Sequence, residues 1–232
     1  MKSLKNKKTL VFILAVFMMA AFCLTACTKD TDKEVKNESK EEMQNETTKF
    51  EKDEALDKFI NPEMKNDVLE APIGADVPKL AFANDKYAGV LNYNGLLIYK
   101  LDDKKLSSAI DINALGFDRI QGDGAIEITS NDDYLVLNKM GKTDGYVYSL
   151  GDKYLSKLDD LSKISASKAE YLENEGINEI KAKIDEKDKD INAIMTQNGY
   201  VVLTLDYDNL KDSKLSKLDK NYELVNSFNL SE

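Results

Sequence analysis

The residue types in this chain limit the chemistry it can perform. It contains no histidine, and its two cysteines, Cys23 and Cys27, both lie near the N-terminus. Catalysis by serine–histidine or cysteine–histidine pairs, histidine-ligated zinc and histidine pH switching are therefore excluded. With no cysteine beyond residue 27, thiolate chemistry and cysteine-ligated metals are excluded from the rest of the chain. We expect no catalytic residue, no metal site and no cofactor.

One serine and one lysine have the spacing of enzymes that acylate an active-site serine. Ser165-Ala166-Ser167-Lys168 matches the Ser-x-x-Lys pattern, in which the lysine activates the serine at the start of a helix. Those enzymes also need Ser-Asp-Asn and Lys-Thr-Gly motifs, and Lys142-Thr143-Asp144-Gly145 is not the second of these. Ser167 to Glu170 fits a helix-capping box instead. We therefore predict a helix start rather than an acylation site.

Carboxylates occur in five short groups. The groups are Asp102-Asp103, Asp132-Asp133, Asp159-Asp160, Asp185 to Asp190, and Asp206 with Asp208. None has the spacing of a helix–loop–helix calcium site, and the first two fall at predicted turns, where aspartate accepts local hydrogen bonds. Structural turns are the favoured interpretation. Weak calcium binding and a carboxylate pair for glycoside hydrolysis stay open as alternatives.

The most site-like loop is Gln121-Gly122-Asp123-Gly124, which follows the only arginine of the chain, Arg119. It joins two predicted units of β-structure and brings a cation into an acidic protein. We take Arg119, Gln121, Gly122 and Asp123 as the candidate binding loop. The alternative is a glycine-rich turn whose aspartate accepts backbone hydrogen bonds.

The N-terminus has the layout of a secretory signal peptide. Four lysines in the first eight residues precede an apolar run from Thr9 to Leu24, and the run ends in Leu24-Thr25-Ala26-Cys27. That ending resembles the lipobox of bacterial lipoproteins, in which the cysteine thiol receives a diacylglyceryl group and a peptidase cuts before it. The resemblance implies a signal peptide at 1–26 and lipid attachment at Cys27, on the extracellular face of the cell membrane. The alternative is an uncleaved transmembrane helix, for which the apolar run is short.

Residues 27–57 are predicted to be an anchor and a disordered acidic tether. Thr28 to Asp57 is almost entirely polar or charged, so it cannot bury enough apolar surface to offset its ordering entropy. Without the four lysines of residues 1–26, the chain has 28 basic and 42 acidic residues. Such a charge disfavours nucleic acid as a partner.

Residues 58–232 are predicted to form one mainly β domain. Period-two patterns punctuated by turn residues recur three times, and Tyr87, Tyr134 and Tyr200 begin corresponding strands. Asn94-Gly95 is typical of a type I′ hairpin turn. The predicted strands are 80–82, 87–93, 96–101 and 106–112, then 125–129, 134–139, 146–150 and 154–158, then 192–196, 200–206, 214–218 and 222–230. Three four-stranded meanders of this length predict a propeller-like array that is open or distorted, because closed propellers need at least four blades.

A helical insertion is expected at about 161–187. Ile177, Ile180 and Ile184 lie three and four residues apart, which gives a helix one apolar face. We expect that face to pack against a sheet.

From Asp76 onward the chain resembles the extracellular C-terminal domain of Gram-positive antirepressor metallopeptidases of the β-lactam-sensing type. The matching segments are VPKLAFA at 77–83, NGLLIY at 94–99, QGD at 121–123 and YVY at 146–148. The resemblance implies a β-propeller-like module outside the membrane with a sensing role. Two cysteines of that family are replaced here by Phe117 and Ile126, which removes a disulfide, and the peptidase portion is absent.

Together these features predict a lipid-anchored extracytoplasmic lipoprotein that binds or senses without catalysis. Its expected partners are the membrane, through the lipid on Cys27, and a protein or envelope component. The alternatives are an envelope hydrolase that uses carboxylates, and an accessory subunit of a membrane sensor.

Overall fold

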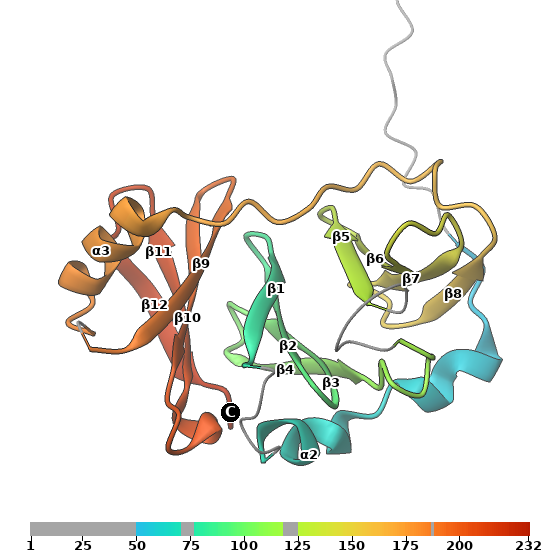
Figure 1. The fold of residues 1–232 in the computed structure, drawn as a ribbon, viewed down its shortest axis with the longest axis horizontal. Coiled ribbons are helices and arrows are strands. Elements are labelled where there is room, and N and C mark those ends of the chain that lie inside the picture. The colour runs from blue at the N-terminus through green and yellow to red at the C-terminus, as the bar shows by residue number, and fades with distance from the viewer. Residues whose placement is uncertain (1–49, 71–76, 118–124, 187) are drawn as a thin grey trace, which may run out of the picture. The chain divides into compact units, whose positions relative to one another are not determined.

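The computed structural model describes residues 50–70, 77–117, 125–186 and 188–232, which fall within one compact unit, Thr48–Glu232. It is mainly β, with three four-stranded antiparallel meanders (Figure 1). The three predicted meanders are confirmed. The strands are β1 (Lys79–Ala83), β2 (Tyr87–Asn92), β3 (Gly95–Lys100) and β4 (Lys105–Ile110) in the first sheet, β5 (Ile126–Ser130), β6 (Tyr134–Lys139), β7 (Gly145–Ser149) and β8 (Leu155–Leu158) in the second, and β9 (Asp190–Thr196), β10 (Gly199–Leu205), β11 (Lys214–Asp219) and β12 (Leu224–Asn229) in the third.

Few helices accompany the sheets. Among the described residues these are η1 (Glu54–Phe59), η2 (Pro62–Met64), α2 (Lys65–Leu69), α3 (Asn174–Lys183) and η4 (Leu210–Asp212), where η marks a 3-10 helix. The helices within this part of the chain are too short to cross a membrane.

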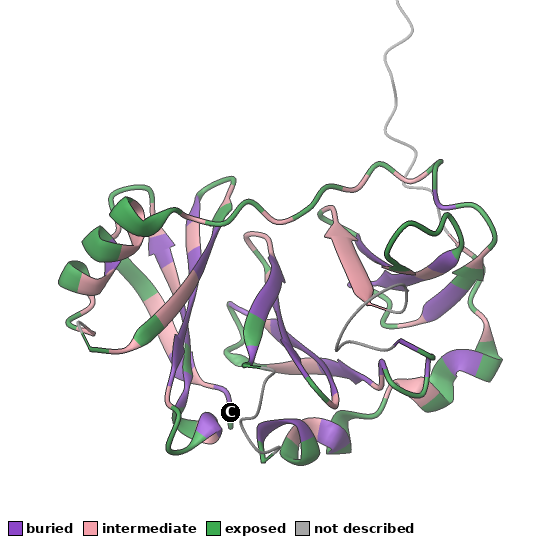
Figure 2. Cartoon of the chain, viewed as in Figure 1, coloured by how far each residue is buried: buried purple, intermediate pink, exposed green. Residues whose placement is uncertain are grey.

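The first sheet is buried on both faces because it lies between the other two. Alternate residues of β3 enter different cores: Leu97 and Tyr99 pack with the third sheet, whereas Leu96 and Ile98 pack with the second. A strand buried on both sides needs apolar residues at successive positions, which explains the unbroken run Leu96 to Tyr99. Figure 2 shows these strands largely buried.

The outer faces of the second and third sheets are covered by chain segments rather than by further sheets. On the third sheet, α3 packs Ile180 against Val202, with Ile177 and Ile184 at the border of the same cluster. The predicted apolar helix face is therefore confirmed. On the second sheet, Phe50 and Leu161 cover the outer face, and the ring of Phe50 meets that of Tyr134 edge-on at 5.0 Å.

The tether was expected to extend to residue 57, and for residues 50–57 this expectation is wrong. Asp53 caps η1, since its Oδ1 accepts a hydrogen bond from the Ala55 amide, and Leu56 is buried between the first and second sheets. Phe50 and Leu56 are isolated apolar residues in a charged stretch, so the average composition hid their burial. The signal peptide, Cys27 and the tether up to residue 49 lie outside the described residues.

The predicted type I′ turn at Asn94-Gly95 is also wrong. Gly95 pairs with Asn92, so the two turn residues are Tyr93 and Asn94, and neither has a positive φ. Gly95 is needed for space: a Cβ there would lie 3.0 Å from Val68 Cγ2 and 3.1 Å from the Ile110 carbonyl oxygen. The close approach of α2, rather than turn geometry, accounts for this glycine.

Only α3 is helical within the predicted insertion. Residues 159–173, here called the strap, make a turn at Leu161 to Ile164 and otherwise run without helix along the edges of the sheets (Figure 1). Ser167 does not cap a helix; it forms a bridge with Ser130 of β5, each amide donating to the other's carbonyl. Farther along, Tyr171 bridges to Ile194 of β9, and its hydroxyl donates to the Leu80 carbonyl of β1. Pairing with the edges of β5 and β9 keeps these residues from forming the predicted helix. The local sequence pattern does not reveal such pairing.

The first strands of the three sheets lie next to one another. β1 contacts both β5 and β9, and the amide of Leu80 in β1 donates to Asn192 Oδ1 of β9 at 2.9 Å. At one end of these strands, the turn between β1 and β2 meets the turns of both other sheets. Asn84 Nδ2 donates to the Asn131 carbonyl, and Asp85 accepts from Thr196 and Asn198.

Candidate functional site: a polar groove on the third sheet

A concave surface lies on the face of the third sheet that α3 leaves partly uncovered. Along β10, Tyr200 and Val202 contact the helix side of the sheet, and Thr204 follows on the same face by the two-residue period. The helix ends at Lys183, before it reaches Thr204. Thr204 is itself buried, and the residues opposite and beside it, Lys214, Ser216 and Asn229, are polar.

Two rows of directly opposed residues form the floor of this surface, which we call the third-sheet groove. One row is Val202, Ser216 and Ser227, and the other is Thr204, Lys214 and Asn229. Two adjoining cavities of about 310 and 340 Å³ occupy it and share Glu186, Thr204, Lys214 and Asn229. Leu224 and Phe228 of β12 and Ile184 at the end of α3 add apolar surface.

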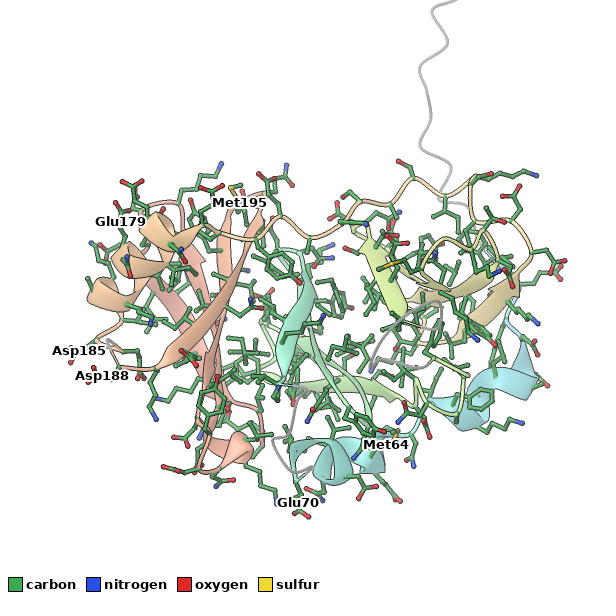
Figure 3. All side chains as sticks on the ribbon, viewed as in Figure 1. Met64, Glu70, Glu179, Asp185, Asp188 and Met195 are labelled. Atoms are coloured by element: carbon green, nitrogen blue, oxygen red, sulfur yellow. The ribbon has the colours of Figure 1, made fainter. Side chains whose placement is uncertain are left out.

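Ion pairs fix the wall of the groove where the chain passes from α3 to β9. Lys189 Nζ lies 2.8 Å from Asp206 Oδ2, and Lys214 Nζ lies 3.2 Å from Glu186 Oε1. In Figure 3, Asp185 and Asp188 mark this connection, and both side chains point outward. Each lysine facing the groove thus has a carboxylate partner, and Asp212 and Glu232 add further negative charge to the lining.

The titration of the wall follows from these contacts. The hydrogen bond from Lys189 holds the pKa of the Asp206 carboxyl below its ordinary value, helped by the amides of Asn209 and Asp208. The same hydrogen bond raises the pKa of Lys189. Nearby, a hydrogen bond donated to Asp190 raises the pKa of the Tyr207 hydroxyl to about 12. Asp206 is therefore ionised at neutral pH and is unsuited to act as a general acid.

The groove offers hydrogen bonds rather than reactive groups. Ser216 Oγ and Ser227 Oγ share a hydrogen bond of 2.9 Å, which leaves lone pairs and a rotatable hydrogen for a ligand. Asn229 can both donate and accept. Hydroxyls, an amide and paired lysines beside three apolar side chains suit a ligand that is itself polar.

A second hollow, of about 630 Å³, lies beside α2 and the end of β4, and three carboxylates line it. Asp67, Glu70 and Asp111 contribute side chains, with Asn94 and Asn113 between them. Figure 3 labels Glu70 and Met64 at this place. Glu70 is bound to Lys211 at 2.6 Å, and Asp111 Oδ1 accepts from the Ala114 amide. Within the described part of the chain, no three acidic side chains are arranged to hold a metal ion.

The residues singled out from the sequence do not gather at one place. Arg119, Gln121, Gly122 and Asp123 lie outside the described residues, as does Cys27. Ser165 and Lys168 belong to the extended strap, and Lys168 Nζ pairs with Glu127 Oε1 rather than with a serine.

The carboxylate groups described by the structure mostly serve turns and ion pairs. Asp103 pairs with Lys100, Asp160 accepts from the Ser162 amide, and Asp206 accepts from the amides of Asp208 and Asn209. This agrees with the structural interpretation of those groups.

Sequence reasoning missed Thr204, Ser216, Ser227 and Asn229, the polar floor of the groove. The available signal was a switch from apolar to polar along one face: Tyr200 and Val202 give way to Thr204 in β10. Such a switch marks where a covering helix ends.

Comparisons with protein-family models, with curated proteins and with solved structures found no match to this chain.

Proposed function

We propose that this chain is a lipid-anchored extracytoplasmic lipoprotein whose β domain is a non-enzymatic module that binds or senses a protein or envelope partner. The observation that carries the binding role is the third-sheet groove, with its floor of Thr204, Ser216, Ser227 and Asn229. Its lysines are neutralised and Asp206 is held ionised, which suits recognition better than acid–base chemistry.

We describe the fold, within this proposal, as an open propeller-like array. Three meanders stacked face to face, with β1 next to both β5 and β9, support this description. The array is open because α3 covers the outer face of the third sheet, and Phe50 and Leu161 cover that of the second.

The resemblance to the extracellular domain of antirepressor metallopeptidases supports a sensing role. Phe117 and Ile126, which replace that family's two cysteines, both contribute to the core between the first and second sheets. The ring of Phe117 lies 6.0 Å from that of Tyr146. Apolar packing here takes the place that a disulfide has in that family.

Two experiments test the two halves of the proposal. A clickable fatty acid fed to cells should label the wild-type chain and Cys23→Ser but not Cys27→Ser; equal labelling of all three would disprove anchoring at Cys27. For the groove, a photoreactive side chain at Asn229 should give an adduct of defined mass in intact cells. The same side chain at exposed Met140, in the loop after β6, serves as the control. Identical adducts at both positions, or none at Asn229, would argue against the groove as the binding site.

The hydrolase alternative has one observation in its favour, the carboxylates of Asp67 and Asp111 in the hollow beside α2. Release of soluble fragments from purified envelope material by the wild type, and its loss in the double variant Asp67→Asn with Asp111→Asn, would move the assignment to an enzyme. The accessory-subunit alternative requires a membrane sensor that is recovered with the chain.

A further inference from the structure

Five of the six sheet edges are engaged by other parts of the chain. The edges of β4 and β8 are paired by the segments around η1: Asn61 donates to Ala109, Phe59 accepts from Asp111, and Asp53 donates to Leu155. The strap pairs with β5 and β9, and Asn192 and Tyr171 bind the edge of β1. Sheet edges left open are templates for pairing with another strand, so this coverage protects the fold.

β12 is the exception. It pairs with β11 on one side, and on its outer edge the hydrogen bond among the described residues is the one at the end of the strand, from the Glu232 amide to the Asn229 carbonyl. The Leu230 amide donates to the Ser213 carbonyl at the end of this ladder. In an antiparallel pair, successive residues point their backbone N–H and C=O groups alternately toward the partner strand and away from it. The backbone groups of Ser227, three residues before Leu230, therefore point away from β11. Those groups are free to receive another strand.

The side chains of β12 also lack the features that normally block edge pairing. Leu224 and Val225 are 56% and 58% exposed, and they are the only sequence neighbours among the exposed large hydrophobic residues of the described chain. From Leu224 to Ser231 there is no charged residue, in a chain that is 32% charged. Soluble proteins usually protect an open edge with lysine, proline or a β-bulge. β12 has neither lysine nor proline, and its register shifts at Val225, so the regular part of its edge lies from Asn226 onward.

We infer that β12 pairs antiparallel with β12 of a second copy of this chain, forming a two-fold symmetric dimer with a continuous eight-stranded sheet. A two-fold axis places each residue near the centre opposite itself or a close neighbour. Leu224, Val225, Asn226 and Ser227 tolerate this because none is charged. The other occupants to be weighed are a segment of the same chain outside the described residues and a strand from a different protein.

Charge favours the second copy as the occupant. A neutral strand offers no charged group with which to select a foreign partner, but it satisfies the one condition that self-pairing imposes, the absence of like charges across the axis. The rest of each copy is acidic, since the net charge of the chain is −10. Long-range repulsion should therefore weaken the dimer at low salt and be screened at high salt. Dimerisation by β12 also borders the third-sheet groove, yet it does not depend on the function proposed for that groove.

The experiment measures self-association and the position of the contact. The chain from Thr28 onward contains no cysteine, so single cysteines can be introduced without background. Under mild oxidation, Leu224→Cys, Val225→Cys or Ser227→Cys should yield a disulfide-linked dimer for at least one position, whereas Met140→Cys should not. Sedimentation of the unmodified chain should show a monomer–dimer equilibrium that tightens from about 10 mM to 1 M salt, as the screening length falls from about 30 Å to 3 Å.

Lysine substitutions provide the matched test. Val225→Lys should raise the dimer dissociation constant roughly tenfold or more, because a symmetric interface loses each contact twice and gains like charges. Met140→Lys, at an equally exposed site of 60%, should leave the constant unchanged. Circular dichroism checks that both variants are folded.

Each remaining outcome overturns the proposal. A strictly monomeric chain, equal effects of Val225→Lys and Met140→Lys, or an open-ended ladder of oligomers would do so. If the chain from Thr28 is monomeric and the chain from Thr48 dimerises through β12, the occupant is the chain's own N-terminal segment. A β12 cross-link in cells to a protein of another mass would identify a foreign strand instead.

Discussion

Asn84 and Asn131 hold the same turn in neighbouring sheets and contact each other. In each turn the asparagine Oδ1 accepts from the amides two and three residues ahead, ending at Tyr87 or Tyr134. Asn84 Nδ2 then donates to the carbonyl of Asn131, 47 residues along the chain. The internal repeat of the sequence is thus also a contact in space.

Loss of either asparagine should destabilise the domain. Asn84→Ala and Asn131→Ala each leave two turn amides without their acceptor, at a cost of about 1–2 kcal/mol in the free energy of unfolding. Asp132→Ala, in the same turn but without a hydrogen-bonded side chain, should change stability by less than about 0.5 kcal/mol. Urea unfolding measures all three. Equal effects for Asn131→Ala and Asp132→Ala would show that the turn does not depend on its asparagine.

Two buried tyrosines should respond oppositely to removal of the hydroxyl. Tyr99 in β3 donates to the Leu230 carbonyl at 2.8 Å, whereas the Tyr148 hydroxyl in β7 faces Ser108 without a hydrogen bond of good geometry. Burial raises the pKa of Tyr148 to about 12. Tyr99→Phe should lose about 1 kcal/mol, and Tyr148→Phe should be neutral or stabilising by up to about 1 kcal/mol. Thermal unfolding compares them, and a larger loss for Tyr148→Phe would contradict this account of the two hydroxyls.

The segment before residue 58 should be part of the fold. A chain starting at Lys58 lacks Phe50, Leu56 and the pairing of Asp53 with Leu155, and it exposes the outer face of the second sheet. Compared with a chain starting at Thr48, it should lose at least about 3 kcal/mol, since burial of one large apolar side chain contributes about 1.5–3 kcal/mol. Equal denaturation midpoints for the two chains would show that residues 48–57 contribute nothing.

Asp206 should titrate below its ordinary pKa, with a consequence for stability. A depressed folded-state pKa gives a stabilising contribution that is present above the unfolded pKa and is lost as pH falls through the folded pKa. Carboxyl NMR titration of Lys189→Ala should show the pKa of Asp206 rising, though still held down by the amides of Asn209 and Asp208. Asp219 is lowered mainly by backbone amides, so its pKa should stay unchanged in that variant. A response of Asp219 equal to that of Asp206 would argue against the Lys189 contact.

A fluorescent penicillin should form no covalent adduct with this protein. The amine of Lys168 is paired with Glu127, and Ser165 lies in the extended strap, where its carbonyl accepts from Asn131 Nδ2. An acylated band lost in both Ser165→Ala and Lys168→Ala would overturn this expectation. The assignment would then move from partner binding to antibiotic sensing.

The sequence predicted the strands well because their signals are local. The apolar run from Tyr134 to Leu137, with Asn131 in the preceding turn, is sufficient to predict β6. What it could not predict depends on contacts between distant segments. Gly95 is required by α2, Ser167 is held by β5, and the groove draws residues from three strands, β10, β11 and β12. The solitary Phe50 is recognisable as a core residue only once the outer face of the second sheet is known.

The strap has a consequence for the order in which the chain folds. Within each sheet, neighbouring strands are consecutive in sequence, so their pairing closes only short loops and should be fast. The strap has no partner until β5 and β1 have formed. It can pair with β9 only after β9, which follows it in the sequence, has formed as well. Association of finished sheets, rather than formation of the hairpins, should therefore set the folding rate. A chain that folds from its N-terminus would therefore hold two assembled sheets before the third is complete.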